Sequence, residues 1–141
     1  MKKIYASLFI ISSLLFFSCS KDFLKPYEDR IIGTWHISDI NRIGLGGSTD
    51  NLPFQEGNFV FSRDGSLVYT DASGNVSNGY WEIEKRNENN DIKRTLHVTA
   101  VSFNDQDIRA EFYDEMDFRS TDHFVGKVNN AFHTFVTHFR R

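Results

Sequence analysis

Cysteine is nearly absent from this sequence. The 141 residues contain a single one, Cys19, close to the N-terminus. One thiol cannot form an intramolecular disulfide framework or a zinc site built from several cysteines. The fold must therefore be stabilised by packing, and aromatic residues, at 15% of the chain, supply the side chains for it.

A surplus of basic residues is also absent. The chain has 16 Lys and Arg against 19 Asp and Glu, a formal net charge of −3. Binding to nucleic acid requires a basic surface that displaces counterions from phosphates. The composition therefore argues against a nucleic-acid partner, and equally against docking to anionic lipid through charge alone.

No apolar run is long enough to cross a bilayer, which takes roughly 20 residues. The N-terminal apolar stretch, residues 4–17, carries no charge and follows two basic residues, Lys2 and Lys3. A basic region followed by a short apolar region is the layout of a secretory signal. We therefore predict a signal peptide over residues 1–18.

The cysteine directly follows this apolar segment. Ser18 precedes Cys19, a polar stretch at 20–22 follows it, and Phe16 and Phe17 stand before Ser18. This arrangement resembles the lipobox of bacterial lipoproteins, in the aromatic variant of the Bacteroidetes type. The resemblance implies that Cys19 becomes the first residue and carries a diacylglycerol and a further acyl chain. Two or more chains make a stable anchor, at about 0.8 kcal/mol per buried CH2.

The predicted location is thus the cell envelope, as an outer-membrane lipoprotein whose first partner is the membrane itself. Residues 19–30 would be the lipidated N-terminus and a short tether that contains Pro26. Lys21 and Asp22 partly resemble the export signal of surface lipoproteins, so the surface and periplasmic faces both stay open. An ordinary signal peptide followed by an incidental cysteine is the alternative.

Helical periodicity is missing from residues 31–141. Apolar residues alternate with polar ones, and turn residues interrupt them at short intervals, a pattern typical of hairpins. Asp64 and Gly65 indicate a tight turn, because glycine tolerates a positive φ. We predict strands over residues 31–40, 58–62, 67–70, 78–85, 92–103, 107–118, 124–128 and 131–139.

Eight antiparallel strands in simple succession favour an all-β fold, a single up-and-down barrel over residues 31–141, because closure removes exposed sheet edges. An open β-sandwich is the alternative. The interior of an eight-stranded barrel is either filled by side chains or just wide enough for one small ligand. One connection, residues 41–56, is long, and long loops in compact domains are often functional.

Several motifs occur in the order found in lipocalins. Gly33 and Trp35 form a G-x-W pattern in the first predicted strand. Thr121 and Asp122 stand before the seventh predicted strand, and Arg140 follows the last one. Together with an F-x-F-x-x-D-G hairpin, they resemble the lipocalin-like domains of Bacteroidetes lipoproteins over most of residues 31–141. The resemblance implies that Arg140 lies across the Trp35 ring, a cation–π contact at the closed end of the barrel.

The resemblance also implies a cup for a small apolar ligand, with Leu45 and Phe54 of the long loop as gate residues. The candidate lining residues are aromatic: Phe59, Phe61, Tyr69, Trp81, Phe112, Phe124 and Phe135. These rings equally suit a filled barrel. In that case the protein would act as a structural or inhibitor-like subunit that docks another envelope protein.

Catalytic and metal-binding patterns are lacking. His133 and His138 are five residues apart on one predicted strand and so face opposite sides. The acidic run at 114–117, with Glu111 nearby, suits a hard cation, but a solvated strand end is the simpler interpretation. No G-x-S-x-G motif occurs. We therefore expect a binding protein rather than an enzyme, with no cofactor and no metal.

Surface display makes a direct prediction. Protease added to intact cells should cleave a surface-exposed protein, because its domain lies outside the membrane barrier. Immunoblotting before and after cell lysis measures this, and a protein cut only after lysis would place it on the periplasmic face.

Overall fold

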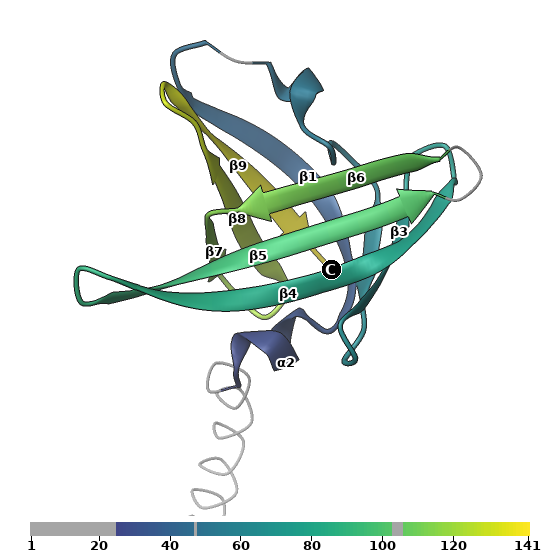
Figure 1. Cartoon of the computed structure of the whole chain (residues 1–141), viewed down its shortest axis with the longest axis horizontal. Coiled ribbons are helices and arrows are strands. Elements are labelled where there is room, and N and C mark those ends of the chain that lie inside the picture. Colours follow the sequence, from purple (N-terminus) through teal and green to yellow (C-terminus); the bar gives the residue numbers. More distant parts are fainter. Residues whose placement is uncertain (1–24, 47, 103–105) are drawn as a thin grey trace, which may run out of the picture.

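The chain folds as one antiparallel β-sheet that is preceded by a short helix (Figure 1). The computed structural model describes residues 25–46, 48–102 and 106–141. The predicted signal peptide, Cys19 and most of the predicted tether lie outside the described residues. The helices are α2 (Tyr27–Ile31) and the 3-10 turn η2 (Thr49–Asn51). The strands are β1 (Gly33–Gly44), β2 (Asn58–Phe61), β3 (Ser66–Thr70), β4 (Val76–Glu88), β5 (Asp91–Ser102), β6 (Asp107–Tyr113), β7 (Glu115–Phe118), β8 (His123–Asn129) and β9 (His133–Arg140).

The sheet has nine strands in the order β6-β5-β4-β3-β2-β1-β9-β8-β7. Each strand therefore pairs with a strand that is next to it in the chain. In addition, β1 pairs with β9, whereas the consecutive strands β6 and β7 lie at opposite edges. Within the described residues, the edge strands β6 and β7 share no ladder. The sheet thus coils round without closing by backbone hydrogen bonds, in contrast to the closed barrel of eight strands that we expected.

The additional strand arises from a corner at Asp114. We predicted one strand over residues 107–118, but β6 pairs with β5 whereas β7 pairs with β8. The Asp114 carboxylate accepts a hydrogen bond of 2.7 Å from the backbone N–H of Asn129. The buried positions also shift by one residue here, from Tyr113 to Met116 and Phe118. Unbroken alternation of buried and exposed residues would keep residues 107–118 in one strand paired with β5. Because the alternation shifts, the chain passes to the opposite edge of the sheet and pairs there with β8.

The predicted hairpin at Asp64 and Gly65 is confirmed. β2 and β3 pair from Phe61 with Leu67 onward, and Gly65 has a φ of 83°. The Asp64 carboxylate accepts a 3.0 Å hydrogen bond from the Ser66 N–H, which lowers the pKa of Asp64 together with the bond from the Ser66 hydroxyl. The turn therefore uses both a glycine conformation and a local side-chain cap.

The N-terminal part differs from the prediction in two ways. Helix α2 covers the last four residues of the predicted tether and Ile31, and Tyr27 and Ile31 pack on the core. Strand β1 begins at Gly33, whose φ of 122° suits glycine, and continues to Gly44 because β9 pairs with its residues from His36 to Gly44. The long loop therefore starts after residue 44 instead of residue 40.

Trp35 organises the end of the sheet at which α2 lies. Its side chain is fully buried, and its indole N–H donates a 2.6 Å hydrogen bond to the carbonyl of Ile31. Its ring contacts Phe124 edge-on at 4.7 Å and Phe118 at 6.0 Å. One side chain thus joins α2, β1, β7 and β8, and it closes this end of the fold.

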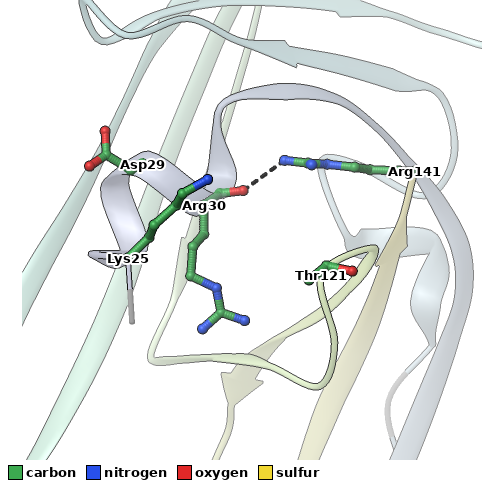
Figure 2. Close-up of a pocket in the computed structure, with 5 residues that line it drawn as sticks. All are labelled: Lys25, Asp29, Arg30, Thr121 and Arg141. Carbon is green, nitrogen blue, oxygen red and sulfur yellow. Dashed lines mark hydrogen bonds between the residues drawn. The ribbon is translucent and has the colours of Figure 1, made fainter. Parts of the chain in front are cut away.

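An arginine does cover the Trp35 ring, but it is Arg141 and not Arg140. The Arg141 guanidinium carbon lies 4.4 Å from the ring centroid. The same guanidinium donates a hydrogen bond of 2.8 Å to the carbonyl of Arg30 (Figure 2) and another of 2.8 Å to the carbonyl of Ile32. Arg140 lies on β9 opposite His36 and His123 and is exposed. Adjacent strand residues face opposite sides, so the prediction failed by one residue.

Replacing each arginine in turn tests this assignment. We expect Arg141→Ala to lower the free energy of unfolding by about 1–2 kcal/mol, because one cation–π contact and two hydrogen bonds are lost at a partly exposed site. Arg140→Ala should change it by less than about 0.5 kcal/mol. Urea denaturation followed by tryptophan fluorescence measures both, and equal effects would contradict the assignment.

Candidate functional site

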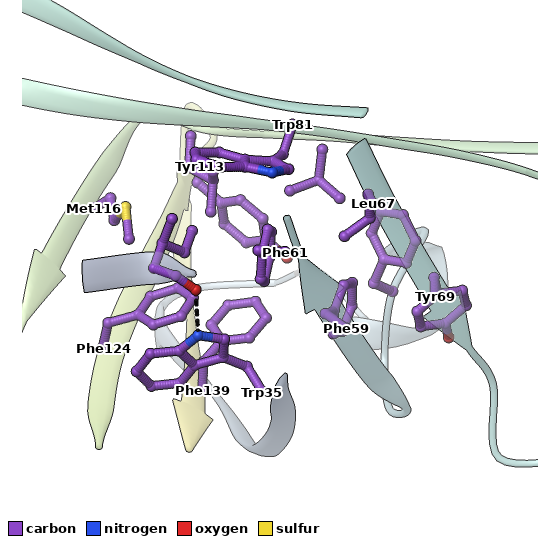
Figure 3. Packing of buried hydrophobic residues seen from close by; sticks show 14 of the residues in the cluster. Trp35, Phe59, Phe61, Leu67, Tyr69, Trp81, Tyr113, Met116, Phe124 and Phe139 are labelled. Carbon is purple, nitrogen blue, oxygen red and sulfur yellow. Dashed lines mark hydrogen bonds between the residues drawn. The ribbon is translucent and has the colours of Figure 1, made fainter. Parts of the chain in front are cut away.

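Aromatic rings fill the interior of the sheet (Figure 3). Phe124 stacks on Phe139 with ring centroids 4.4 Å apart, and Phe59 lies 4.8 Å from Tyr69. Of the predicted lining residues, most are buried within this cluster: Phe54, Phe59, Phe61, Tyr69, Trp81 and Phe124. These side chains occupy the space that a deep ligand cup would need.

The two predicted gate residues lie in different environments. Phe54 is 1% exposed and makes edge-on contacts with Phe59 at 5.3 Å and Tyr69 at 4.9 Å. Leu45 is 83% exposed and projects from the end of β1. Phe54 therefore plugs the interior from the loop, whereas Leu45 takes no part in the core.

Phe112 and Phe135 are separated by the sheet itself. Phe112 is half-buried and packs on the His97 ring at 4.2 Å, on the face opposite to buried Tyr113. Phe135 is 3% exposed and points inward from β9, above the filled part of the interior. Only Phe135 of these two lies where an interior ligand could meet it.

A cleft of about 610 Å³ remains at the end of the sheet opposite α2. We call it the mouth cleft. It lies between the edge strand β6, the β8–β9 hairpin and the loop that follows β1, so it occupies the upper part of the gap that the missing ladder leaves. Its walls include Leu52, Pro53, Glu111, Val128, Phe132 and Phe135. Lower in the same gap, Tyr113 closes the space, since a Cβ added at Gly126 would lie 2.5 Å from its ring.

Among the described residues that line the mouth cleft, Glu111 is the only acidic one. Burial raises the pKa of Glu111; the Phe112 N–H, 3.2 Å from a carboxylate oxygen, lowers it, and the charge of Asp114 raises it further. Among the described residues, no lysine or arginine forms an ion pair with it. From the sequence, Glu111 was expected only as a neighbour of the acidic run at 114–117. Its two-residue spacing from Tyr113 was the signal that it faces inward.

The acidic run at 114–117 is engaged by the protein itself. Glu115 forms ion pairs with Lys127 at 2.7 Å and Lys93 at 3.2 Å, which hold its pKa below the usual range. Asp117 pairs with Arg119 at 3.2 Å and accepts a hydrogen bond from Tyr27. These carboxylates tie β7 to its neighbours, in agreement with a structural role.

His123 and His138 form a hydrogen-bonded pair on the outer face. Their facing ring nitrogens are 3.0 Å apart, and the Asn41 amide donates to the other nitrogen of His138. His138 must then donate its single proton to His123 in the neutral form. Burial and the nearby charge of Arg140 lower the pKa of His123. Over the described ranges, no group of three or more His, Cys, Asp or Glu side chains is placed to hold a metal ion.

Comparison with protein-family models, curated proteins and solved structures finds no match for this chain. No helix within the described part of the chain is long and apolar enough to cross a membrane. The function must therefore be argued from the geometry.

Shortening the plug tests how the interior is filled. Phe54→Ala should cost about 3–5 kcal/mol of stability, because a fully buried ring is replaced by a cavity. Leu45→Ala, an exposed apolar residue of the same loop, should change stability by less than about 0.5 kcal/mol. Thermal unfolding measures both, and a small effect of Phe54→Ala would show that the ring is not part of the core.

Proposed function

We propose that this protein is a membrane-anchored lipoprotein with a lipocalin-like β-barrel architecture that binds a small, partly apolar molecule in the mouth cleft. The observation that carries the proposal is the cleft itself. Its volume of about 610 Å³ lies within the range of roughly 300–1,000 Å³ common for ligand sites. The aromatic core beneath it leaves the upper end of the interior as the place for a ligand.

The position of α2 supports this arrangement. Helix α2 lies at the end of the sheet opposite the β8–β9 hairpin and the loop after β1 (Figure 1), two of the segments that line the mouth cleft. Cys19 precedes α2 by only a few residues in the chain. A lipid on Cys19 would therefore hold the α2 end of the sheet towards the outer membrane. The cleft would then face away from the bilayer and receive its ligand from the aqueous side.

A cleft-filling variant tests ligand binding. Ala131 and Ala110 are both exposed, but only Ala131 lines the mouth cleft. The neutral fluorescent hydrophobe N-phenyl-1-naphthylamine should bind the chain from residue 20 onward, which contains the whole core between Tyr27 and Phe139. Ala131→Trp should weaken this binding at least about tenfold by occupying the cleft, and Ala110→Trp should leave it unchanged.

Native mass spectrometry of the protein from its own envelope provides an independent readout. A retained small molecule that Ala131→Trp abolishes would support the proposal. A bare chain mass, together with no uptake of the fluorescent probe, would contradict it.

A second candidate function is docking to another envelope protein, and one exposed surface favours it. Ile43, Leu45 and Phe132 are 63%, 83% and 81% exposed. They lie together, because β1 pairs with β9 here and the Leu45 N–H donates to the Phe132 carbonyl at 3.0 Å. Chemical cross-linking in cells tests this surface: the unmodified protein should capture an envelope protein, and Phe132→Ser should lose it. That result, together with no uptake of the fluorescent probe by the unmodified chain, would favour docking over ligand binding.

The anchor has its own test. Cys19→Ala should move the protein from the membrane fraction to the soluble fraction of lysed cells and abolish incorporation of radiolabelled fatty acid, because the acyl chains have no other attachment. Ser20→Ala, beside it, should change neither. Continued membrane association of Cys19→Ala without label would contradict lipidation at this residue.

A further inference from the structure

The carboxylate of Glu111 is unusual among those of β6 and β7. It projects inward from the edge strand β6, two residues before buried Tyr113. It accepts a hydrogen bond of 3.2 Å from the adjacent backbone N–H of Phe112. By contrast, Glu115 pairs with two lysines and Asp107 lies 2.8 Å from Arg109. Glu111 therefore has no counter-charge among the described residues.

The histidine of the cleft does not supply that charge. An Asn130 amide nitrogen lies 3.1 Å from Nε2 of His133. An amide NH2 group only donates, so this ring nitrogen of His133 is engaged by Asn130 and not by Glu111. Asp114, the charged group that acts on Glu111, is itself negative. The protein thus leaves a partly desolvated acid without compensation, which is energetically unfavourable unless a ligand supplies a cation.

Apolar side chains form a large part of the remaining wall. Leu52, Pro53, Val128, Phe132 and Phe135 line the cleft, beside the uncharged polar groups of Ser48, Asn51 and Asn130 and the ring of His133. The aromatic rings also provide faces on which a cation is attracted. One carboxylate beside several apolar walls matches a molecule with one positive group on an apolar body.

We infer that the mouth cleft binds amphiphilic amines, with the ligand's ammonium group paired to the Glu111 carboxylate and its apolar body against Val128 and Phe135. This inference rests on the proposed ligand-binding function and specifies the chemical class of its ligand. It assigns Glu111 the role of a specificity-determining residue rather than a structural one.

Three probes of equal length separate charge from apolar contact: octylamine, octanol and octanoate. Each is titrated against the chain from residue 20 onward that is loaded with N-phenyl-1-naphthylamine. The titration is run at about pH 8, where an alkyl amine is protonated and octanoate is ionised. Octylamine should displace the fluorophore at a concentration at least about tenfold lower than octanol, and octanoate should be the weakest.

The Glu111→Gln variant keeps the shape of the side chain and removes its charge. It should abolish the preference for octylamine over octanol and leave octanol unchanged. Glu82→Gln, an exposed acid on β4 away from the cleft, is the matched control and should retain the preference. The order of the three probes on the unmodified chain tests the inference even if Glu111→Gln is unstable.

The outcomes separate the two proposals. Octanol binding without a preference for octylamine would overturn the inference and leave the ligand-binding function standing. Preference for octylamine that persists in Glu111→Gln would overturn the role of Glu111. Absence of fluorophore uptake by the unmodified chain would overturn both proposals together.

Discussion

The hydrogen bond from the Trp35 indole to the Ile31 carbonyl, 2.6 Å long, is the contact on which one end of this fold depends. It fixes α2 against β1, and the same ring packs on Phe118 and Phe124 from the last part of the sheet. The Arg141 guanidinium covers the ring and donates hydrogen bonds to the carbonyls of Arg30 and Ile32, the residues on either side of Ile31. Because a buried indole N–H without a partner is costly, the helix, the first strand and the C-terminal residue are stabilised together.

The open seam between β6 and β7 follows from the corner at Asp114. At the α2 end, side chains connect β5 to β7 in place of a ladder: Lys93 reaches Glu115 at 3.2 Å, and Tyr27 of α2, whose ring Arg94 of β5 covers, donates to Asp117. Tyr113 fills the middle of the seam against Gly126. At the far end neither a ladder nor a large ring closes the gap, so the mouth cleft remains there. Glu111, on the exposed edge of β6, contributes its carboxylate to that gap.

Much of the strand pattern could be predicted from alternation alone. Phe59 and Phe61 were expected on one face, and both are 1% exposed. The hairpin at Asp64 and Gly65 was expected from its turn chemistry and has the positive φ that glycine permits. The candidate ligand residues were less predictable. An aromatic side chain can line a cup, fill it or lie outside it. Phe135 lines the cleft, Phe54 fills the interior from the loop, and Phe112 packs on the outer face.

The sequence by itself determined the all-β class, most strand positions and the absence of a disulfide framework, because these depend on local alternation, turn residues and composition. Only the tertiary structure decided that Arg141 covers Trp35, that the sheet stays open at β6 and β7, and that Glu111 faces the remaining cleft. Each of these depends on register: a shift of one residue moves a side chain to the opposite face of a strand. A bulge between Ile37 and Asp39 and the corner at Asp114 set that register, and the one-dimensional pattern does not reveal them.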